Sequence, residues 1–205
     1  MIKTVDKMTY EEKENLLKQI IEDLKQNLSE KRYLHSISTM EKAVELAKKY
    51  NQDEQIVKLT AIAHDIAKEM TKEEYIAYAK ENNIELDKID YIEIIALHGK
   101  IGAKITSKKY GFTKEMQDAI YYHTTARANM TILDKIIFLA DKIENTRNYE
   151  GVEELIKVYE SNYNLDETIL WDIDYYTIPK MIKQQRMIHP NSIYARNDII
   201  SKLNL

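Results

Sequence analysis

Glycine and proline are scarce in this chain of 205 residues, which has four glycines and two prolines. Folds built from many strands need tight turns, and these two residues supply the backbone angles of most such turns. The scarcity therefore argues against a β-rich or α/β fold. We expect an all-α protein with one domain over residues 1–205: an N-terminal helix at about 9–28, a core at about 29–150 and C-terminal helices at about 151–205.

The composition excludes several classes of site. A net charge of −4 argues against a general nucleic-acid surface, which normally carries a basic excess. The chain has no cysteine, so disulfides, thiolate zinc sites and cysteine nucleophiles are excluded, and a metal would need His, Asp or Glu. No apolar run of about 18 residues occurs, and the N-terminus lacks the apolar stretch of a signal peptide. We therefore expect no membrane association and a cytoplasmic protein.

Threonines mark the expected starts of several helices, because their hydroxyl groups cap exposed backbone N–H groups. The first start, Thr9, is followed by Glu12 in the spacing of a capping box. The expected helices cover about 9–28, 33–50, 53–68, 72–82, 100–109, 113–127, 131–147, 151–161 and 166–187, with a last one that begins at Pro190.

The segment AIAHDIAKE, residues 61–69, reads as part of a buried helix that carries charged residues at its centre. Helical spacing places His64, Asp65 and Lys68 with Ala61 on the side opposite an apolar stripe. An unpaired buried carboxylate costs several kcal/mol, so Asp65 needs a partner. The pattern indicates the wall of a site. The alternative is that His64 and Asp65 are ordinary polar residues at the edge of the stripe.

A second carboxylate follows a buried helix near residue 141. The run 136–140, IIFLA, is apolar on every side, which is typical of a buried helix. Asp141 comes directly after it and should therefore be paired, hydrogen-bonded or bound to a metal. An ion pair with the nearby Arg147 is the alternative explanation.

Four of the five histidines lie where apolar segments meet polar ones. His98 stands just before Gly99, where the backbone can come close to another group. His189, in IHPNS, is expected in a turn before the last helix. Any one of the four could be an ordinary helical histidine, but together they indicate a shared site; they are His35, His64, His98 and His123.

The order of these residues resembles the HD-domain superfamily of metal-dependent phosphohydrolases. The His-Asp dipeptide alone is common by chance, but a longer ordered set is similar to the YqeK family. Its segments run from residue 32 to 197: RYLHS at 32–36, AIAHDIAK at 61–68, LHGKIGA at 97–103, AIYYHTTAR at 119–127, LDKIIFLADKIENTR at 133–147 and IHPNSIYARN at 188–197.

This resemblance implies an HD-type helical bundle with symmetrical bis(5′-nucleosyl)-tetraphosphatase activity, in which diadenosine tetraphosphate and water give two ADP. It also implies an iron site of one or two ions. The first ion would be bound by His35, His64, Asp65 and Asp141. His98 and His123 match positions that line the same pocket, and they would hold a second metal or contact phosphate.

The residue types agree with this implication. Imidazole and carboxylate ligands without sulfur suit iron, manganese or zinc better than magnesium alone. Asp65 is well placed to bridge two ions, and such ions bind a phosphate oxygen and lower the pKa of an attacking water. We expect Asp65 and Lys68 to be the catalytic residues.

A tetraphosphate carries about four negative charges, so local cations must neutralise them on a net-negative protein. Arg32 precedes His35 by one turn, and Arg127 follows His123 by one turn. Arg186 to Arg196 could close over the nucleotide. For each cation a surface ion pair is the alternative. The expected phosphate-binding residues are Arg32, Lys68, Thr124, Arg127 and Arg147.

Two other functions fit the same residues. Another HD-type phosphohydrolase, a nucleotidase or a phosphodiesterase acting on an ADP- or GDP-type nucleotide, would use the same ligands. A non-catalytic nucleotide-binding module would keep the scaffold alone. The products of hydrolysis distinguish them. A homodimer is plausible for the family, but no pattern in this sequence supports one.

Overall fold

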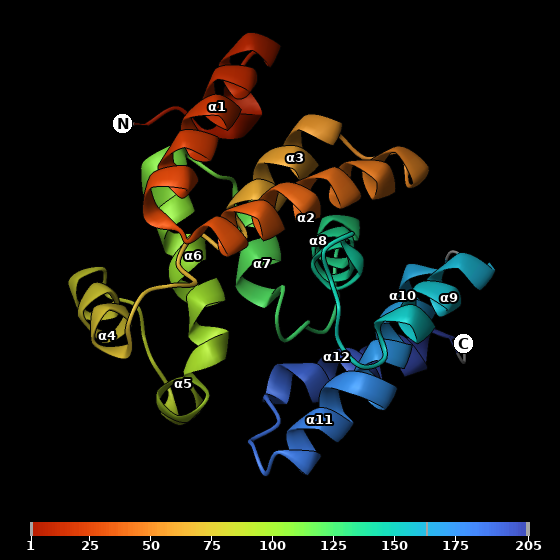
Figure 1. The fold of residues 1–205 in the computed structure, drawn as a ribbon. Coiled ribbons are helices and arrows are strands. Elements are labelled where there is room, and N and C mark those ends of the chain that lie inside the picture. Colours follow the sequence, from red (N-terminus) through yellow and green to blue (C-terminus); the bar gives the residue numbers. More distant parts are fainter. Residues whose placement is uncertain (1, 163, 204–205) are drawn as a thin grey trace.

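The computed structural model describes residues 2–162 and 164–203, so the two ends of the expected domain, residue 1 and residues 204–205, lie outside it. The described chain is helical and has no strand, which confirms the all-α fold (Figure 1). None of its described helices is long and apolar enough to cross a membrane. In chain order the elements are a 3₁₀ turn Val5–Lys7, α1 Tyr10–Asn27, α2 Glu30–Lys49, α3 Glu54–Ala63, α4 Lys72–Glu81, α5 Lys88–Ile92, α6 Ile94–Tyr110, α7 Lys114–Tyr122, α8 Ile132–Ile143, α9 Val152–Asn162, α10 Leu165–Trp171, a π-helix Asp172–Thr177, α11 Ile178–Lys183 and α12 Pro190–Leu203.

The helix α8 lies at the centre of the fold. Figure 1 shows it nearly end-on, with α2 and α7 on one side and the C-terminal helices on the other. Ile136 and Ile137 belong to the main core, which includes residues from α1 to α10. Phe138 belongs to a second core with Ile169 and Ile199, so α8 joins the C-terminal helices to the rest. Asp141 lies near the end of α8, so the packing of this helix in both cores fixes its position.

The threonine caps confirm the expected helix starts. Thr9, Thr71 and Thr131 each form a capping box, in which the hydroxyl accepts the third backbone N–H and a carboxylate returns to the cap's N–H. The Thr113 hydroxyl accepts the N–H of Met116. These contacts are local, which explains why the sequence predicts them.

The helix expected at 53–68 is shorter, because α3 ends at Ala63. The backbone N–H of His64 and its ring Nδ1 both bond to the carbonyl of Ala61, at 3.3 and 2.7 Å. Tight bonds to the third residue back follow, including Lys68 N–H to the Asp65 carbonyl at 2.9 Å. The expected helix is therefore wrong at these positions, since His64, Asp65 and Lys68 lie on a tight turn that follows α3. The three side chains still lie together, because those of His64 and Lys68 both contact Asp65.

The helix expected at 166–187 is divided into three elements, and it ends at Lys183. Pro179 has no N–H to donate to the carbonyl four residues earlier. The chain widens into a π-helix there, and Ile178 N–H bonds to the Ile173 carbonyl, five residues back.

Other boundaries differ by less. The helix expected at 33–50 begins earlier, at Glu30, and the helix expected at 100–109 begins at Ile94. The helices expected to reach about 127 and 147 end at Tyr122 and Ile143. Residues 123–127 and 144–147 therefore lie on connections. From there the side chains of His123, Thr124, Glu144 and Arg147 approach the site.

Candidate metal centre

Four helices bring the predicted histidines into one buried group. His35 projects from the N-terminal half of α2, His98 from α6, and His64 and His123 directly follow α3 and α7. Neighbouring ring centroids are 5.2 Å apart for His35 and His64, 5.0 Å for His64 and His123, and 4.8 Å for His98 and His123. All four side chains are buried.

Gly99 allows two of these histidines to meet. A Cβ atom at Gly99 would lie 2.6 Å from the carbonyl oxygen of Tyr121 and 2.9 Å from that of Ile120. Only glycine permits such a close approach of α6 to α7. As a result, Nε2 of His98 lies 2.9 Å from Nε2 of His123. The prediction that the backbone comes close to another group at Gly99 is confirmed.

Three of the histidine rings are oriented in the same way. Nδ1 of His64, His98 and His123 contacts the carbonyl oxygen three residues earlier, at 2.7 Å for His64 and 2.6 Å for His123. A carbonyl only accepts, so Nδ1 carries the proton and Nε2 offers a lone pair. Metal-binding histidines are commonly fixed by such a bond. The three carbonyls belong to Ala61, Ile95 and Ile120.

Glu144 orients the fourth ring, a role that sequence reasoning missed. Its Oε1 lies 3.1 Å from Nδ1 of His35. Burial acts to raise the pKa of Glu144, but hydrogen bonds from His35, Ser38 and Thr146 lower it to about 2. The carboxylate is therefore ionised and holds His35 with its Nε2 toward the centre. The available signal was the spacing: Glu144 follows Asp141 by three residues at the end of a buried helix.

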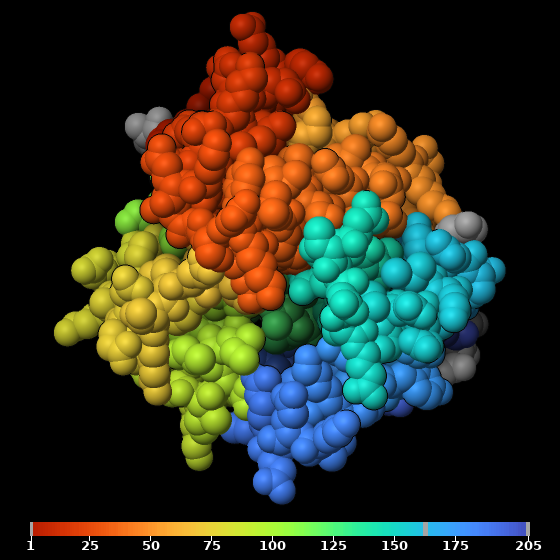
Figure 2. Space-filling view, in the orientation of Figure 1, coloured from red at the N-terminus to blue at the C-terminus, as the bar shows by residue number. Residues whose placement is uncertain are grey.

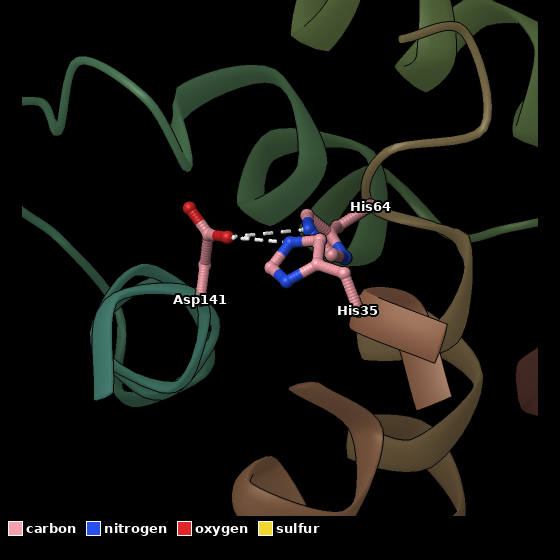
Figure 3. Close-up of side chains that lie close together, drawn as sticks. All are labelled: His35, His64 and Asp141. Atoms are coloured by element: carbon pink, nitrogen blue, oxygen red, sulfur yellow. Dashed lines mark ion pairs between the residues drawn. The ribbon is translucent and has the colours of Figure 1, made fainter. Parts of the chain in front are cut away.

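His35, His64 and Asp141 form the first group of potential metal ligands (Figure 3). Oδ1 of Asp141 lies 3.0 Å from Nε2 of His35 and 3.5 Å from Nε2 of His64. Burial acts to raise the pKa of Asp141, but Arg147 and the two imidazoles hold it well below its usual range. An ionised carboxylate thus faces two imidazole nitrogens.

His64, Asp65 and His123 form the second group. Oδ1 of Asp65 lies 3.0 Å from Nε2 of His98 and 3.4 Å from Nε2 of His123. Its other oxygen, Oδ2, lies 3.7 Å from Nε2 of both His35 and His64. The two oxygens of Asp65 therefore face different pairs of histidines, which is the arrangement that a bridging ligand needs.

Buried nitrogen and oxygen atoms that lack hydrogen bonds show whether these residues fit a cation. His64 and Asp65 are 0% and 1% exposed, yet His64 Nε2 has no hydrogen-bond partner among the described residues, and Asp65 Oδ1 has none there besides its ion pair with Lys68. Buried polar atoms are normally bonded, so this pair needs an explanation. The pKa of His98 is lowered to about 4 by burial and by Lys68, which leaves its imidazole neutral. Ionised carboxylates and neutral imidazoles fit a divalent cation.

Two predicted cations contact Asp65. Nζ of Lys68 lies 3.3 Å from Asp65 Oδ1 and 3.0 Å from Nε2 of His98. A guanidinium nitrogen of Arg32 lies 3.6 Å from Asp65 Oδ2. Burial acts to raise the pKa of Asp65, but His64, Lys68 and the other neighbours hold it well below its usual range.

Arg147 and Thr124 reach the same group from opposite sides. The Arg147 guanidinium pairs with Asp141 and lies 3.4 Å from Nε2 of His35. The predicted alternative for Asp141, an ion pair with Arg147, thus coexists with its place among the histidines. The Thr124 hydroxyl lies 3.3 Å from Nε2 of His123.

The structure does not bring the remaining predicted arginines to the centre. Arg127 donates to Asp134 at 2.8 Å and lies 3.4 Å from Asp118. Arg186 pairs with Glu93, and Arg196 pairs with Asp174. His189, expected in a turn, directly precedes α12.

Comparisons with known proteins agree with this geometry. The family model described as HD domain matches residues 32–146. A protein of Halalkalibacterium halodurans named symmetrical bis(5′-nucleosyl)-tetraphosphatase is 36% identical over 86% of this chain and 93% of its own length. One of the same name from Bacillus subtilis is 32% identical over 87% of this chain and 94% of its own length.

A solved structure extends the agreement to the fold. It comes from Clostridium acetobutylicum and is described as a predicted HD superfamily hydrolase involved in NAD metabolism. It is 37% identical to this chain with a TM-score of 0.85, covering 90% of this chain and 97% of its own. These findings confirm the resemblance found in the sequence. The chain belongs to the HD-domain family, in the group of the symmetrical bis(5′-nucleosyl)-tetraphosphatases.

Proposed function

We propose that this protein is a metal-dependent hydrolase that cleaves diadenosine tetraphosphate symmetrically to two ADP. The observation that carries the proposal is the position of Asp65, whose two oxygens each face a different pair of buried imidazoles. The names of the relatives from Halalkalibacterium halodurans and Bacillus subtilis supply the substrate.

The geometry supports the ligand set that the resemblance implies. His35, His64, Asp65 and Asp141 would hold one ion, and His98 and His123 would hold a second ion or contact a phosphate. Iron suits nitrogen and oxygen donors without sulfur, and manganese or another divalent cation fits the same set. A cation bound here would supply Lewis-acid activation of water and of a phosphoryl oxygen.

The chain's own cations would neutralise the phosphates. Phosphoryl transfer depends mainly on positioning and on charge stabilisation. Symmetrical cleavage places the middle of the tetraphosphate at the centre, so charge must be neutralised on both sides of it. Lys68 lies beside His98, and Arg147 lies beside His35, so the two cations contact different histidines of the group. Arg32 and Thr124 complete this set.

The test is hydrolysis of diadenosine tetraphosphate by protein loaded with iron or manganese, with the products separated by chromatography. We expect ADP as the sole nucleotide product, and its loss in Asp65→Ala. Asp174→Asn is the matched control, because Asp174 pairs with Arg196 away from the centre.

Other product patterns identify the rival functions. AMP together with ATP would mean that the bond cut is not the central one, and a nucleoside product would indicate a nucleotidase. An inactive wild type that still binds ADP would indicate a non-catalytic nucleotide-binding module.

A further inference from the structure

The turn that follows α3 carries Lys68, the predicted catalytic cation, on a weakly held backbone. Its N–H groups bond to carbonyls three residues back, as in Ile66 to Ala63 at 3.1 Å and Lys68 to Asp65 at 2.9 Å. Such bonds have poorer geometry than those of an α-helix. Yet Nζ of Lys68 lies 3.3 Å from Oδ1 of Asp65 and 3.0 Å from Nε2 of His98. A position this specific needs support from outside the turn.

Tyr75, on α4, supplies such support. Its hydroxyl donates to the carbonyl of Ala67, the residue before Lys68, at 2.7 Å. Tyr75 is 5% exposed and Ala67 is 1% exposed, so water does not compete for this bond. Burial and the charges of Asp65 and Glu74 raise the pKa of Tyr75 to about 12, so the hydroxyl keeps its proton and remains the donor.

An apolar cluster fixes the Tyr75 ring and joins the turn to α6. The cluster contains Ala67, Tyr75 and Leu97. Ala67 directly precedes Lys68, and Leu97 directly precedes His98. The side chains of Lys68 and His98 are the two that meet at 3.0 Å. The Tyr75 hydroxyl therefore bonds to the backbone beside this contact.

A second anchor holds the far end of the turn. The carboxylate of Glu69 accepts bonds from the backbone N–H of Ser29 at 2.5 Å and from its hydroxyl at 2.6 Å, just before α2. In Figure 2 the yellow segment that includes α4 lies against the orange-red segment where α1 ends and α2 begins. Glu69 and Ser29 are exposed, so water can replace their bonds. The buried bond from Tyr75 has no such replacement, and its loss should therefore have the larger effect.

We propose that Tyr75 is a positioning residue for the hydrolysis: its hydroxyl fixes the turn so that Lys68 keeps its place beside Asp65 and His98. The inference rests on the proposed function, in which Lys68 neutralises phosphate charge. It also gives a part in the reaction to α4, a helix that supplies none of the proposed ligands or cations.

A double-mutant cycle tests whether the hydroxyl acts through Lys68. The measurements are kcat and KM for diadenosine tetraphosphate, together with metal content, on manganese-loaded wild type, Tyr75→Phe, Lys68→Met and the double variant. Tyr75→Phe keeps the ring in its cluster and removes only the hydroxyl. Tyr78→Phe is the matched control, because it removes a hydroxyl from a tyrosine of the same helix that packs against the same cluster.

We expect Tyr75→Phe to lower kcat about tenfold, the effect of roughly one buried hydrogen bond, with metal content unchanged. A displaced Lys68 still attracts the phosphates of the bound substrate, so KM should stay within about twofold of the wild-type value. In protein that already carries Lys68→Met, Tyr75→Phe should have no further effect, since the hydroxyl acts through Lys68. The control should match the wild type.

Three results would contradict the inference. An unchanged kcat in Tyr75→Phe would overturn it. So would the same fold loss with and without Lys68→Met, because the hydroxyl would then act on the fold rather than through Lys68. If the wild type did not hydrolyse diadenosine tetraphosphate, the proposed function itself would fail, and this inference with it.

Discussion

Two buried aspartates, Asp65 and Asp134, are each 1% exposed and each lie close to a cation, but their surroundings differ. Asp134 faces the guanidinium of Arg127, which has only N–H donors and no lone pair. Asp65 faces the Nε2 atoms of four histidines. Burial raises the pKa of Asp134, whereas the neighbours of Asp65 overcome burial and lower its pKa. A buried carboxylate alone therefore does not identify a site, whereas converging lone pairs do.

The largest effect is expected from Asp65→Asn. The amide keeps the shape but loses the charge and one acceptor, so the metal that activates water should be lost or misplaced. We expect hydrolysis to fall by about 10³-fold. Metal content by mass spectrometry and release of ADP are the measurements, with Asp134→Asn as the matched control. An Asp65→Asn protein with full metal and full activity would remove the distinction between the two aspartates.

Arg127→Met should affect stability instead. It leaves Asp134 buried without its cation, and breaking such a pair costs about 3 kcal/mol of unfolding free energy. Urea denaturation measures this loss, while kcat and metal content of the folded fraction should stay at the wild-type values. A raised KM with unchanged stability would instead support the prediction from sequence that Arg127 binds phosphate.

Glu144→Gln changes a residue that contacts the predicted metal ligand His35. The amide still accepts a bond from Nδ1 of His35 but no longer carries the charge that orients the ring. Partners of metal-binding histidines contribute about 10–100-fold to affinity, and the lower figure is expected here. Competition with a chelator measures it. An affinity equal to that of the wild type would mean that His35 is oriented without Glu144.

Mild acid should give the smallest effect, because opposing groups partly cancel. Burial lowers the pKa of His64, and it lowers that of His98 to about 4. Between about pH 6.5 and 4 these two rings therefore take up protons in the unfolded chain more readily than in the folded protein. His35 opposes this: burial is outweighed by Asp141 and Glu144, its pKa is raised, and it stabilises the fold at acid pH.

The net result is a stability that falls as the pH drops through that window. Below about pH 4 the lowered pKa values of Asp65 and Asp141 add to the loss of stability, since both carboxylates take up protons more readily in the unfolded chain than in the folded protein. Thermal unfolding of metal-free protein from pH 7 to 4 measures the trend. Constant or rising stability would contradict these pKa directions.

Local chemistry explains what the sequence predicts well. Thr9 and Thr131 cap helices through residues three positions away, so the pattern alone is enough. The grouping of His35, His64 and Asp141 follows from the resemblance to the family. The distances between them depend on how α2, α3 and α8 pack, which no local pattern contains.

Contacts outside one helix account for much of what the sequence misses. α3 ends at Ala63, and in the turn that follows the His64 ring contacts the carbonyl of Ala61, a contact that belongs to the site. The partner of Arg127 is Asp134, on the next helix, after a turn in which Ala126 has a φ of +57°. Spacing along one helix cannot show such a turn.

The most direct test of the central claim is anomalous diffraction at the manganese edge from crystals grown with Mn²⁺. The account predicts a peak within about 2.5 Å of His35 Nε2, His64 Nε2 and a carboxylate oxygen of Asp141, with Asp65 as a further ligand. A second peak between His98 and His123 would show that this pair binds an ion rather than phosphate. The absence of any peak among the four histidines, in crystals that bind manganese elsewhere, would contradict the account.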